Sequence, residues 1–349
     1  MIDGINISNN DKETVRKILT VPELVYQKEE QILKNDGSLF TKQLHTYKKL
    51  KFIFSGCYID NCFVPNKLEI KGSLHYYWNN GVHNYNNFDY NGLKSVLNEL
   101  QNKFYINLPD WKIHSLEYGV NLITLLNINK FLNHSFYNGT LKFQEPMHKP
   151  YKQAGETTNN DVLHKLYNKG FQNIKLTNDN ILRYEIRINN SRALKRLTGI
   201  SILSDLLNID KLLKLHSLLI ENFNDILFSD YSIRTKKLTT IEKKNLVKYQ
   251  NQITWDDYKN YSSRNTFNNN KMKFNDLISN HSDNILKALC EEVKKQGIKN
   301  LNLNSYKAEL YNRNLCVYRT LKMSKNCAYT YLYIDSIRTI NNPIKKLRK

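Results

Sequence analysis

The segment Asn180-Ile-Leu-Arg-Tyr-Glu-Ile-Arg-Ile-Asn-Asn190 determines the predicted fold class, because its side chains alternate strictly in character. Even positions from Leu182 onward are apolar, and odd positions carry Arg183, Glu185 and Arg187. This period of two is typical of a β-strand with one face toward a core and one polar face. On that polar face, a carboxylate that can bind a metal ion lies between two guanidinium groups that can bind phosphate.

A second segment, His114–Ile123, repeats this pattern. Its polar face carries Glu117, Gly119 and Asn121, and apolar residues alternate with them. A glycine between two oxygen-bearing side chains leaves room for an ion or a ligand backbone to approach closely. Glu117 or Glu185 alone is consistent with an ordinary solvent-facing strand residue. Two strands that each carry a central glutamate on the polar face favour a shared site instead.

The charge of the chain favours a nucleic-acid partner. The 349 residues include 52 basic and 32 acidic side chains, which gives a formal charge of +20. A strongly basic protein most often binds nucleic acid, and the 23 tyrosines and 14 phenylalanines offer rings on which unpaired bases can stack. An AT-rich genome also produces many Asn, Lys, Ile and Tyr residues, which accounts for part of the basic excess.

Other classes of protein lack support in the sequence. No apolar run approaches the roughly 18 residues that a membrane span needs, and the first residues do not have the basic start and apolar core of a signal peptide. The five cysteines are scattered, and only Cys57 and Cys62 lie close together, so their spacing indicates neither a zinc site nor a disulfide framework. We therefore expect a cytoplasmic protein with no membrane partner.

The first half of the chain is predicted to contain strands and one long helix. Residues 13–34 are weakly helical in pattern, and strands are predicted at 51–58 and 67–77. A helical stripe of apolar residues covers 90–104 and precedes the strand that carries Glu117. The order strand–strand–helix–strand predicts an antiparallel sheet with a helix behind it.

The second half repeats the order of these elements. Strands are predicted at 139–144, 162–169 and 181–189, followed by a helix over 191–207, and the proline-containing segment 145–160 is predicted as loop. The predicted fold class is therefore α+β, with an antiparallel sheet built from two strand–strand–helix–strand lobes. The helices are expected on one face, and a helical C-terminal region follows.

The composition changes after about residue 200. Stretches with helical spacing lie at 202–227, 240–250, 274–296 and 305–323. The Asn-rich segment 262–271 is predicted as a linker or loop. These patterns predict a first domain over 1–200, with lobes at about 50–125 and 139–200, and a mainly helical basic region over 201–349 that ends in a flexible tail.

Three motifs in order carry a resemblance to known proteins. Leu166-Tyr167-Asn168-Lys169 lies in a predicted strand, Arg183-Tyr184-Glu185 follows about sixteen residues later, and the Glu117 strand precedes both. This order over residues 50–200 resembles the rolling-circle replication initiators of small Gram-positive plasmids and the replication proteins of filamentous and related phages. Those families have a hydrophobic-Tyr-Asp-Lys strand and an earlier strand with two acids four residues apart. Here Asn168 and Asn121 stand in place of two of the acids.

The resemblance implies a nickase-like catalytic domain over 1–200 that acts in replication initiation on plasmid or phage DNA. Tyr167 would attack a phosphodiester, forming a 5′-phosphotyrosyl intermediate and a 3′-OH primer. Since a phenol has a pKa of about 10, Lys169 or a metal ion would have to activate it. Mg²⁺ or Mn²⁺ would be held by Glu117, Asn121 and Glu185, because oxygen ligands suit these ions.

The implied partners follow from the same chemistry. Arg183, Arg187 and Lys165 would grip the phosphates of origin DNA, either single-stranded or as a hairpin. A host helicase and polymerase would act with the protein in the bacterial cytoplasm, and an oligomer is possible.

Alternatives remain open at this point. Tyr151, in Lys149-Pro-Tyr-Lys152, is a second candidate nucleophile, and His75 is a candidate third metal ligand because it shares a strand face with Glu69. His114 lies on the apolar face of its strand and is a weaker candidate. A non-catalytic DNA-binding protein, such as a repressor or packaging factor, could be built on the same sheet. A site-specific tyrosine recombinase is a third class, but the sequence has no Arg–His–Arg cluster ahead of a late tyrosine.

The predicted site depends on a specific geometry. Glu117, Tyr167 and Glu185 should converge on the polar face of adjacent strands, with the two carboxylates within roughly 4–5 Å of each other if they share an ion. We expect the Tyr167 hydroxyl to be accessible to solvent. The strands that should lie side by side are 67–77, 113–123, 163–169 and 181–189.

Overall fold

The computed structural model describes residues 2–33, 35, 37–145, 152–154 and 161–303. Met1–Asn302 form one compact unit and Leu303–Lys349 form a second. The candidate nucleophile Tyr151, the predicted helix 305–323 and the predicted tail lie outside the described residues. The predicted division of the chain near residue 200 stays a prediction.

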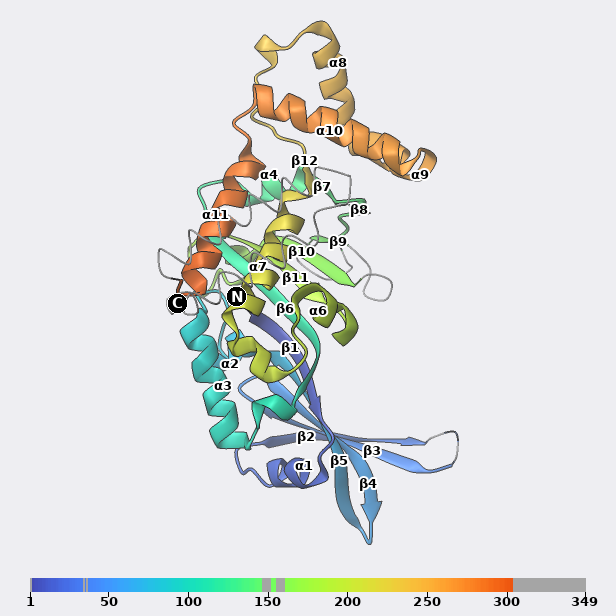
Figure 1. Ribbon diagram of the computed structural model, residues 1–349, viewed down its shortest axis with the longest axis vertical. Coiled ribbons are helices and arrows are strands. Elements are labelled where there is room, and N and C mark those ends of the chain that lie inside the picture. The colour runs from blue at the N-terminus through green and yellow to red at the C-terminus, as the bar shows by residue number, and fades with distance from the viewer. Residues whose placement is uncertain (1, 34, 36, 146–151, 155–160, 304–349) are drawn as a thin grey trace, which may run out of the picture. The chain divides into compact units, whose positions relative to one another are not determined.

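A nine-stranded sheet forms the centre of the first unit (Figure 1). Every neighbouring pair of its strands is antiparallel. In spatial order the strands are β2 (Val25–Leu33), β3 (Leu39–Tyr47), β4 (Leu50–Ile59), β5 (Cys62–Ser73), β1 (Ile2–Asn9), β6 (Lys112–Ile123), β11 (Ile181–Ile188), β10 (Val162–Asn168) and β9 (Lys152–Ala154).

Helices pack on the apolar face of this sheet, as the alternating strands predict. The Phe104 ring of α3 lies 4.9 Å from that of Phe52 on β4, and the Phe223 ring of α7 lies 5.0 Å from that of Tyr184 on β11. Helices α6, α7 and α11 all contact β6. The helices of this part of the chain are α1 (Lys12–Leu19), α2 (Leu74–Trp78), α3 (Tyr90–Phe104), α4 (Ile128–Asn133), α5 (Lys169–Gln172), α6 (Ser191–Thr198), α7 (Ile209–Asn224) and α11 (Ile285–Asn300).

A second, smaller hydrophobic core lies at one end of the first unit, away from the nine-stranded sheet (Figure 1). The Trp255 ring is fully buried and contacts Tyr249, Phe267 and Phe274. This core joins three further helices to a small three-stranded sheet. These elements are α8 (Thr240–Tyr249), α9 (Gln252–Tyr261), α10 (Arg264–His281), β12 (Ile226–Phe228), β7 (Ser135–Asn138) and β8 (Leu141–Lys142).

The predicted fold class is confirmed: helices and strands are mixed, the sheet is large and antiparallel, and the region after residue 200 is mainly helical. Within the part of the chain that the structure describes, no helix combines the length and the apolar character needed to cross a membrane. Helix α3 has the predicted bounds, and β11 and β10 begin at the predicted residues.

Several elements differ from prediction. Strand β1 was missed, and it lies between β5 and β6, which were expected to be neighbours. The segment 13–34, predicted as weakly helical, instead contains the short helix α1 and then the strand β2. Within α1, only Val15 and Ile18 are buried. The predicted linker 262–271 lies mostly in α10, where Ser263 caps the helix by accepting from the Thr266 amide. The predicted loop 145–160 contains β9.

Candidate active site on the polar face of the sheet

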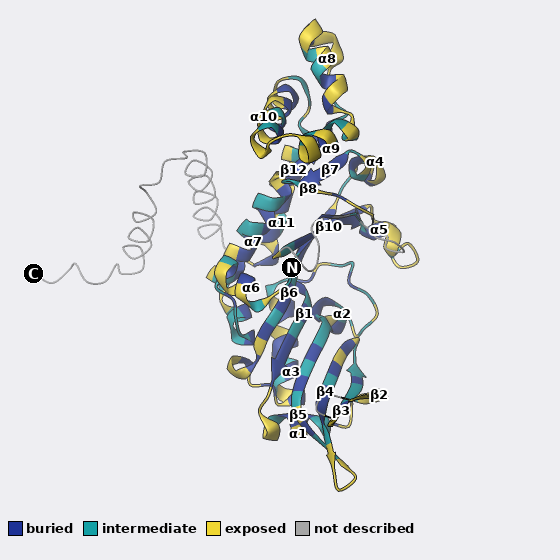
Figure 2. Ribbon diagram, turned by 90° about the vertical axis from the view of Figure 1, so that its right-hand side faces the viewer, coloured by how far each residue is buried: buried dark blue, intermediate teal, exposed yellow. Residues whose placement is uncertain are grey.

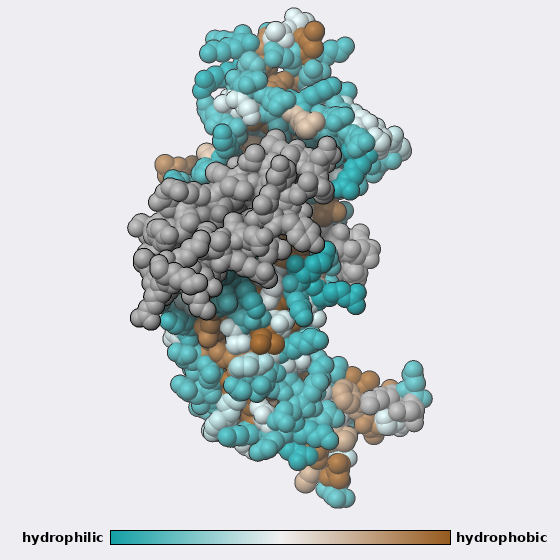
Figure 3. Space-filling view, viewed as in Figure 1, coloured by the Kyte–Doolittle hydropathy of each residue, from teal (hydrophilic) through white to brown (hydrophobic). Residues whose placement is uncertain are grey.

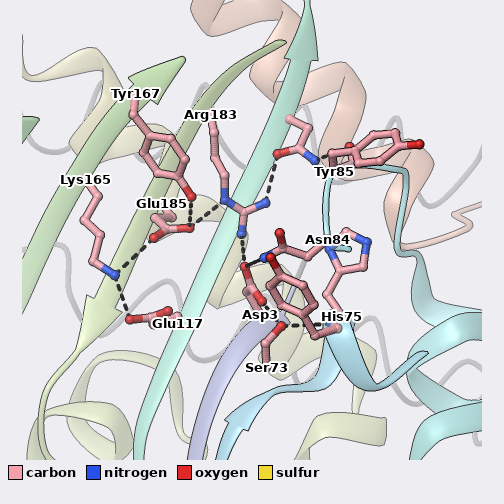
Figure 4. A network of polar contacts seen from close by, with 12 residues as sticks. Asp3, Ser73, His75, Asn84, Tyr85, Glu117, Lys165, Tyr167, Arg183 and Glu185 are labelled. Atoms are coloured by element: carbon pink, nitrogen blue, oxygen red, sulfur yellow. Dashed lines mark hydrogen bonds and ion pairs between the residues drawn. The ribbon is translucent and has the colours of Figure 1, made fainter. Parts of the chain in front are cut away.

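Three adjacent strands bring the predicted site residues together. In the antiparallel register, Tyr167 of β10 lies opposite Arg183 of β11, and Lys165 lies opposite Glu185. On the other side of β11, Arg187 lies opposite Glu117 of β6. Opposed residues share a face of a sheet, so the odd-numbered residues of all three strands lie on one face. Figure 4 shows five of these side chains pointing toward one another: Glu117, Lys165, Tyr167, Arg183 and Glu185.

Arg183 is at the centre of this polar network and is only 1% exposed. Its Nε donates to Glu185 Oε2 at 2.6 Å, and its Nη1 donates to Asn121 Oδ1 at 2.8 Å. Its Nη2 donates to Asp3 Oδ2, also at 2.6 Å. The guanidinium is therefore held by acceptors from β11, β6 and β1 and does not reach the protein surface.

Tyr167 and Glu185 form a hydrogen-bonded pair beside Arg183. The Tyr167 hydroxyl donates to Glu185 Oε2 at 3.3 Å, the same oxygen that accepts from Arg183. Tyr167 is 5% exposed and Glu185 is 4% exposed. A hydroxyl, a carboxylate and a cation that fixes the carboxylate are the three parts of an activated oxygen nucleophile.

Lys165 joins the two glutamates of the predicted metal site. Its Nζ donates to Glu117 Oε1 at 2.8 Å and lies 3.1 Å from Glu185 Oε1. Both carboxylates therefore lie on the same face of the sheet. Gly119 lies opposite Glu185, and a Cβ at this glycine would come within 2.7 Å of the Glu185 Cβ. The space that Gly119 leaves is thus filled by the Cβ and backbone of the neighbouring strand β11.

Asp3 was missed by sequence reasoning, although it completes the network. Ser73, the N-cap of α2, and Asn84 both donate to its carboxylate, and the Asn84 bond is 3.0 Å long. The Asn121 amide donates to the Tyr85 carbonyl at 2.9 Å. Helix α2 and the loop after it therefore cover part of the polar face. The available signal was an acid within the alternating start of the chain, where Ile5 and Ile7 mark a strand.

The charges of the network set the protonation of its acids. Burial would raise the pKa of Asp3, but the charge of Arg183 lowers this pKa to about 2. Burial likewise opposes ionisation of Glu185, but Arg183 and then Lys165 hold the pKa of that carboxyl below its usual value. Burial would lower the pKa of Lys165, yet Glu185 and Glu117 raise it. All of these groups are therefore charged at neutral pH.

The pKa values of Tyr167 and Lys169 are shifted in opposite directions. Burial and then the charge of Glu185 raise the pKa of the Tyr167 phenol well above its ordinary value. Burial and then the charge of Arg183 lower the pKa of Lys169 to about 8. The Lys169 Nζ lies 5.6 Å from the centroid of the Tyr167 ring. An amine with this pKa is neutral in a useful fraction of molecules near neutral pH and can accept a proton there.

A divalent cation does not fit among the predicted ligands as they lie. The Lys165 ammonium fills the position from which an ion would bridge Glu117 and Glu185, and the Asn121 oxygen accepts from Arg183. Among the described residues, no group of three or more His, Cys, Asp or Glu side chains is arranged to hold a metal ion. Binding of Mg²⁺ or Mn²⁺ to these residues would require Lys165 to move away.

Two geometric expectations are wrong. The Tyr167 hydroxyl is not accessible, because the phenol is buried in the network. Arg183 cannot bind phosphate where it lies, because its guanidinium is enclosed and bonded on three sides. Arg187 does have the exposure of a phosphate-binding group, with 42% of its side chain accessible. The alternation of β11 predicted which face these residues share, but not how deeply each is buried.

Each of the two histidines considered as metal ligands has a hydrogen-bond partner within the protein. His75 is buried, its Nε2 lies 2.7 Å from Asn86 Oδ1, and burial lowers its pKa to about 3. His114 Nε2 lies 2.7 Å from Ser8 Oγ on the neighbouring strand β1.

Comparison with known proteins yields weak structural likenesses. No protein-family model and no curated protein matches the sequence. One similar solved structure is the rolling circle replication initiator protein from Geobacillus stearothermophilus, with 13% identity over 72% of this chain and 96% of that chain, at a TM-score of 0.36. Another is the di-domain ARO/CYC StfQ from the steffimycin biosynthetic pathway, with 9% identity over 64% and 95%, at a TM-score of 0.18. At these scores neither likeness establishes a family or a function for this chain.

Proposed function

We propose that this protein initiates replication by nicking DNA, with Tyr167 as the nucleophile. The observation that carries the proposal is the hydrogen bond from the Tyr167 hydroxyl to Glu185, whose carboxylate Arg183 holds in place. This arrangement supplies a nucleophile, a proton acceptor and an orienting cation in one contact chain. The basic composition, with its formal charge of +20, supports a polyanionic substrate.

The reaction is a transesterification. The Tyr167 oxygen attacks a phosphodiester phosphorus while the bond to the 3′ oxygen breaks, so the phosphate stays on the 5′ side as a phosphotyrosyl ester. The phenolic proton passes to Glu185 or Lys169, and the departing 3′ oxygen takes up a proton to become the 3′-OH primer. Because the pKa of Tyr167 is raised and that of Glu185 is lowered, proton loss is unfavourable in the free protein. Lys169, with its pKa of about 8, is the stronger base of the two, and its Nζ lies 5.6 Å from the centroid of the Tyr167 ring.

The surface beside the site can contact a DNA strand. Arg187 is half-exposed on the same face as Glu117. Phe171, two residues after Lys169, has 67% of its surface exposed and could stack on an unpaired base. In this proposal the DNA enters from this side, and Tyr167 becomes accessible when the strand binds.

A second function has an observation in its favour. Tyr167 is buried, and the charged side chains around it are paired with one another, which is also the state expected of a structural polar network. A repressor or packaging factor built on this sheet would bind DNA without cutting it. In that case the network would only fix the register of β6, β11 and β10.

One substitution separates the two functions. Wild-type protein and Tyr167→Phe are incubated with supercoiled plasmid carrying the replicon that encodes the chain, in the presence of Mg²⁺ or Mn²⁺. A nickase gives open circles with covalently attached protein, and Tyr167→Phe loses both products while it retains DNA binding. Tyr261→Phe, at a tyrosine that is 85% exposed on α9, is the matched control and should behave as wild type. Equal nicking by Tyr167→Phe would exclude Tyr167 as the nucleophile, and no nicking by either protein would favour the non-catalytic function.

A further inference from the structure

Lys165 supplies a positive charge between the two glutamates of the site. Its Nζ lies 2.8 Å from Glu117 Oε1 and 3.1 Å from Glu185 Oε1, so one ammonium group bridges carboxylates from β6 and β11. A divalent cation that bridged the same two oxygens would need the same space. The lysine therefore does for these carboxylates what a bound ion would do, because it balances their charge and fixes their separation.

The charges of the site balance one another without an added ion. Outside the grey atoms, hydrophilic side chains cover most of the face drawn in Figure 3, where water can solvate them. Among the described residues, the site instead gathers three carboxylates and, with Lys169 protonated, three cationic groups: Asp3, Glu117, Glu185, Lys165, Lys169 and Arg183. A divalent cation added to this set would leave two unbalanced positive charges in a largely buried site, which is costly.

Lys165 lies between the enclosed part of the site and its exposed rim. The side chain of Arg183 is 1% exposed, that of Lys165 is 13% exposed and that of Arg187 is 42% exposed. Figure 2 shows exposed residues on α5, at the end of β10 that carries Tyr167. Arg187 Nη1 lies 3.9 Å from the same Glu117 oxygen that Lys165 contacts. A phosphate that approaches past Arg187 therefore meets Lys165 before Arg183, and Lys165 can turn toward it while Glu117 keeps a cationic partner.

We propose that Lys165 is the electrostatic catalyst of strand cleavage and that the reaction needs no divalent cation. During attack by Tyr167, the Lys165 ammonium donates a hydrogen bond to a non-bridging oxygen of the scissile phosphate and stabilises the negative charge that develops there. Lys165 keeps its proton throughout, while the bond from the Tyr167 oxygen to phosphorus forms and the bond to the 3′ oxygen breaks. This inference rests on the proposed function, because it names the group that stabilises the phosphate at the same site.

Single-turnover adduct formation on the same supercoiled plasmid, measured in EDTA and in Mg²⁺, tests this role. Wild type should form the adduct at the same rate in both. In EDTA, Lys165→Met should be slower by roughly 10²–10³-fold, the loss typical of removing one donor to a developing oxyanion. Mg²⁺ should restore much of this rate, because an ion can then bind between Glu117 and Glu185. Lys165→Arg keeps the charge and should retain most of the wild-type rate in EDTA.

Further measurements separate catalysis from folding. Mg²⁺ should raise the melting temperature of Lys165→Met, because an ion that binds the folded state stabilises it, and should leave that of wild type unchanged. The double variant Lys165→Met/Glu117→Gln loses one charge of each sign, so it should fold and stay slow in both EDTA and Mg²⁺. Lys295→Met is the matched control, at an ion pair of 2.7 Å with Glu292 whose lysine is 72% exposed, and it should behave as wild type.

The outcomes distinguish this inference from the proposed function. Adduct formation by wild type only in Mg²⁺, or an unchanged rate for Lys165→Met in EDTA, would overturn the role of Lys165 and leave nicking by Tyr167 intact. A slow Lys165→Met that Mg²⁺ does not restore, together with an equally slow Lys165→Arg, would make Lys165 a structural residue and would also overturn it. No adduct from wild type in either condition would overturn the proposed function and, with it, this inference.

Discussion

The Arg183 guanidinium and the Asp3 carboxylate, 180 residues apart in the sequence, are joined by a hydrogen-bonded ion pair of 2.6 Å between Nη2 and Oδ2. Both groups are buried, at 1% and 5% exposure. The pair links β1 to β11 across β6, which lies between them in the sheet. Breaking a buried ion pair is costly, so each member constrains the other.

We expect Asp3→Asn to destabilise the protein strongly. The substitution removes one of the two carboxylates that are paired with the single charge of Arg183, so the loss should be at or below the roughly 3–5 kcal/mol typical of a buried charge left without any partner. Urea denaturation followed by circular dichroism measures the change in unfolding free energy. Asp257→Asn, at an exposed carboxylate of α9, is the control and should change it by less than about 0.5 kcal/mol. A loss that small for Asp3→Asn would mean that Arg183 is adequately held by Glu185 and Asn121.

The same pair predicts a loss of stability in acid. The folded-state pKa of Asp3, about 2, is below its ordinary value of 3.8. Its contribution of about 2 kcal/mol is therefore present above pH 4 and is lost as the pH falls toward 2. Unfolding free energies of wild type and Asp3→Asn should converge over this interval. A difference between the two proteins that stays constant from pH 5 to pH 2 would show that Asp3 does not titrate in this way.

Lys169 should control the pH dependence of covalent adduct formation if it accepts the phenolic proton. Its lowered pKa of about 8 means that the neutral amine becomes available as the pH rises through that value. Single-turnover adduct formation should therefore rise with pH and level off above about 8. Lys169→Met should slow the reaction by roughly 10²–10⁴-fold and remove this pH dependence. Lys175→Met, in the exposed loop that follows α5, should keep the wild-type profile.

Lys165 should limit metal binding to the two glutamates. Its ammonium contacts both Glu117 and Glu185, so Lys165→Met removes a competing cation and leaves two carboxylates that face each other. We expect the dissociation constant for Mn²⁺, measured by electron paramagnetic resonance, to fall by roughly tenfold or more, since one neighbouring positive charge is removed. Adding Glu117→Gln should reverse the gain. Equal Mn²⁺ affinity in wild type and Lys165→Met would place any ion elsewhere on the protein.

The strands of the site could be predicted because their alternation is local. Apolar residues occupy every second position of β11 from Leu182 to Ile188 and of β6 from Leu116 to Leu122, and the structure gives both strands one buried apolar face and one polar face. Helix α3 was equally clear, since its buried residues repeat every three or four positions. Periodicity also gave the correct shared face for Glu117, Tyr167 and Glu185.

The rest of the site depends on long-range packing that periodicity does not contain. Strand β1 includes Gly4 and is defined by pairing with β5 and β6, whose residues lie far away in the sequence. Tyr167 was expected at the surface because a polar face was equated with an exposed one. Helix α2 and the loop after it cover part of that face through the contacts of Asn84 and Tyr85, which no pattern in β10 or β11 indicates.

The central position of β1 has a consequence for how the protein is made. This strand leaves the ribosome before its neighbours in the sheet, since its partner β6 ends at Ile123 and the ion-pair partner Arg183 lies later still. At roughly 5–20 residues per second, Asp3 is synthesised about 10–40 s before Arg183. During that interval the apolar residues Ile2, Ile5 and Ile7 have no completed sheet to join. Strand β1 is therefore synthesised early but is among the last whose native surroundings are complete, and folding of the sheet should follow the arrival of β11 rather than proceed in the order of synthesis.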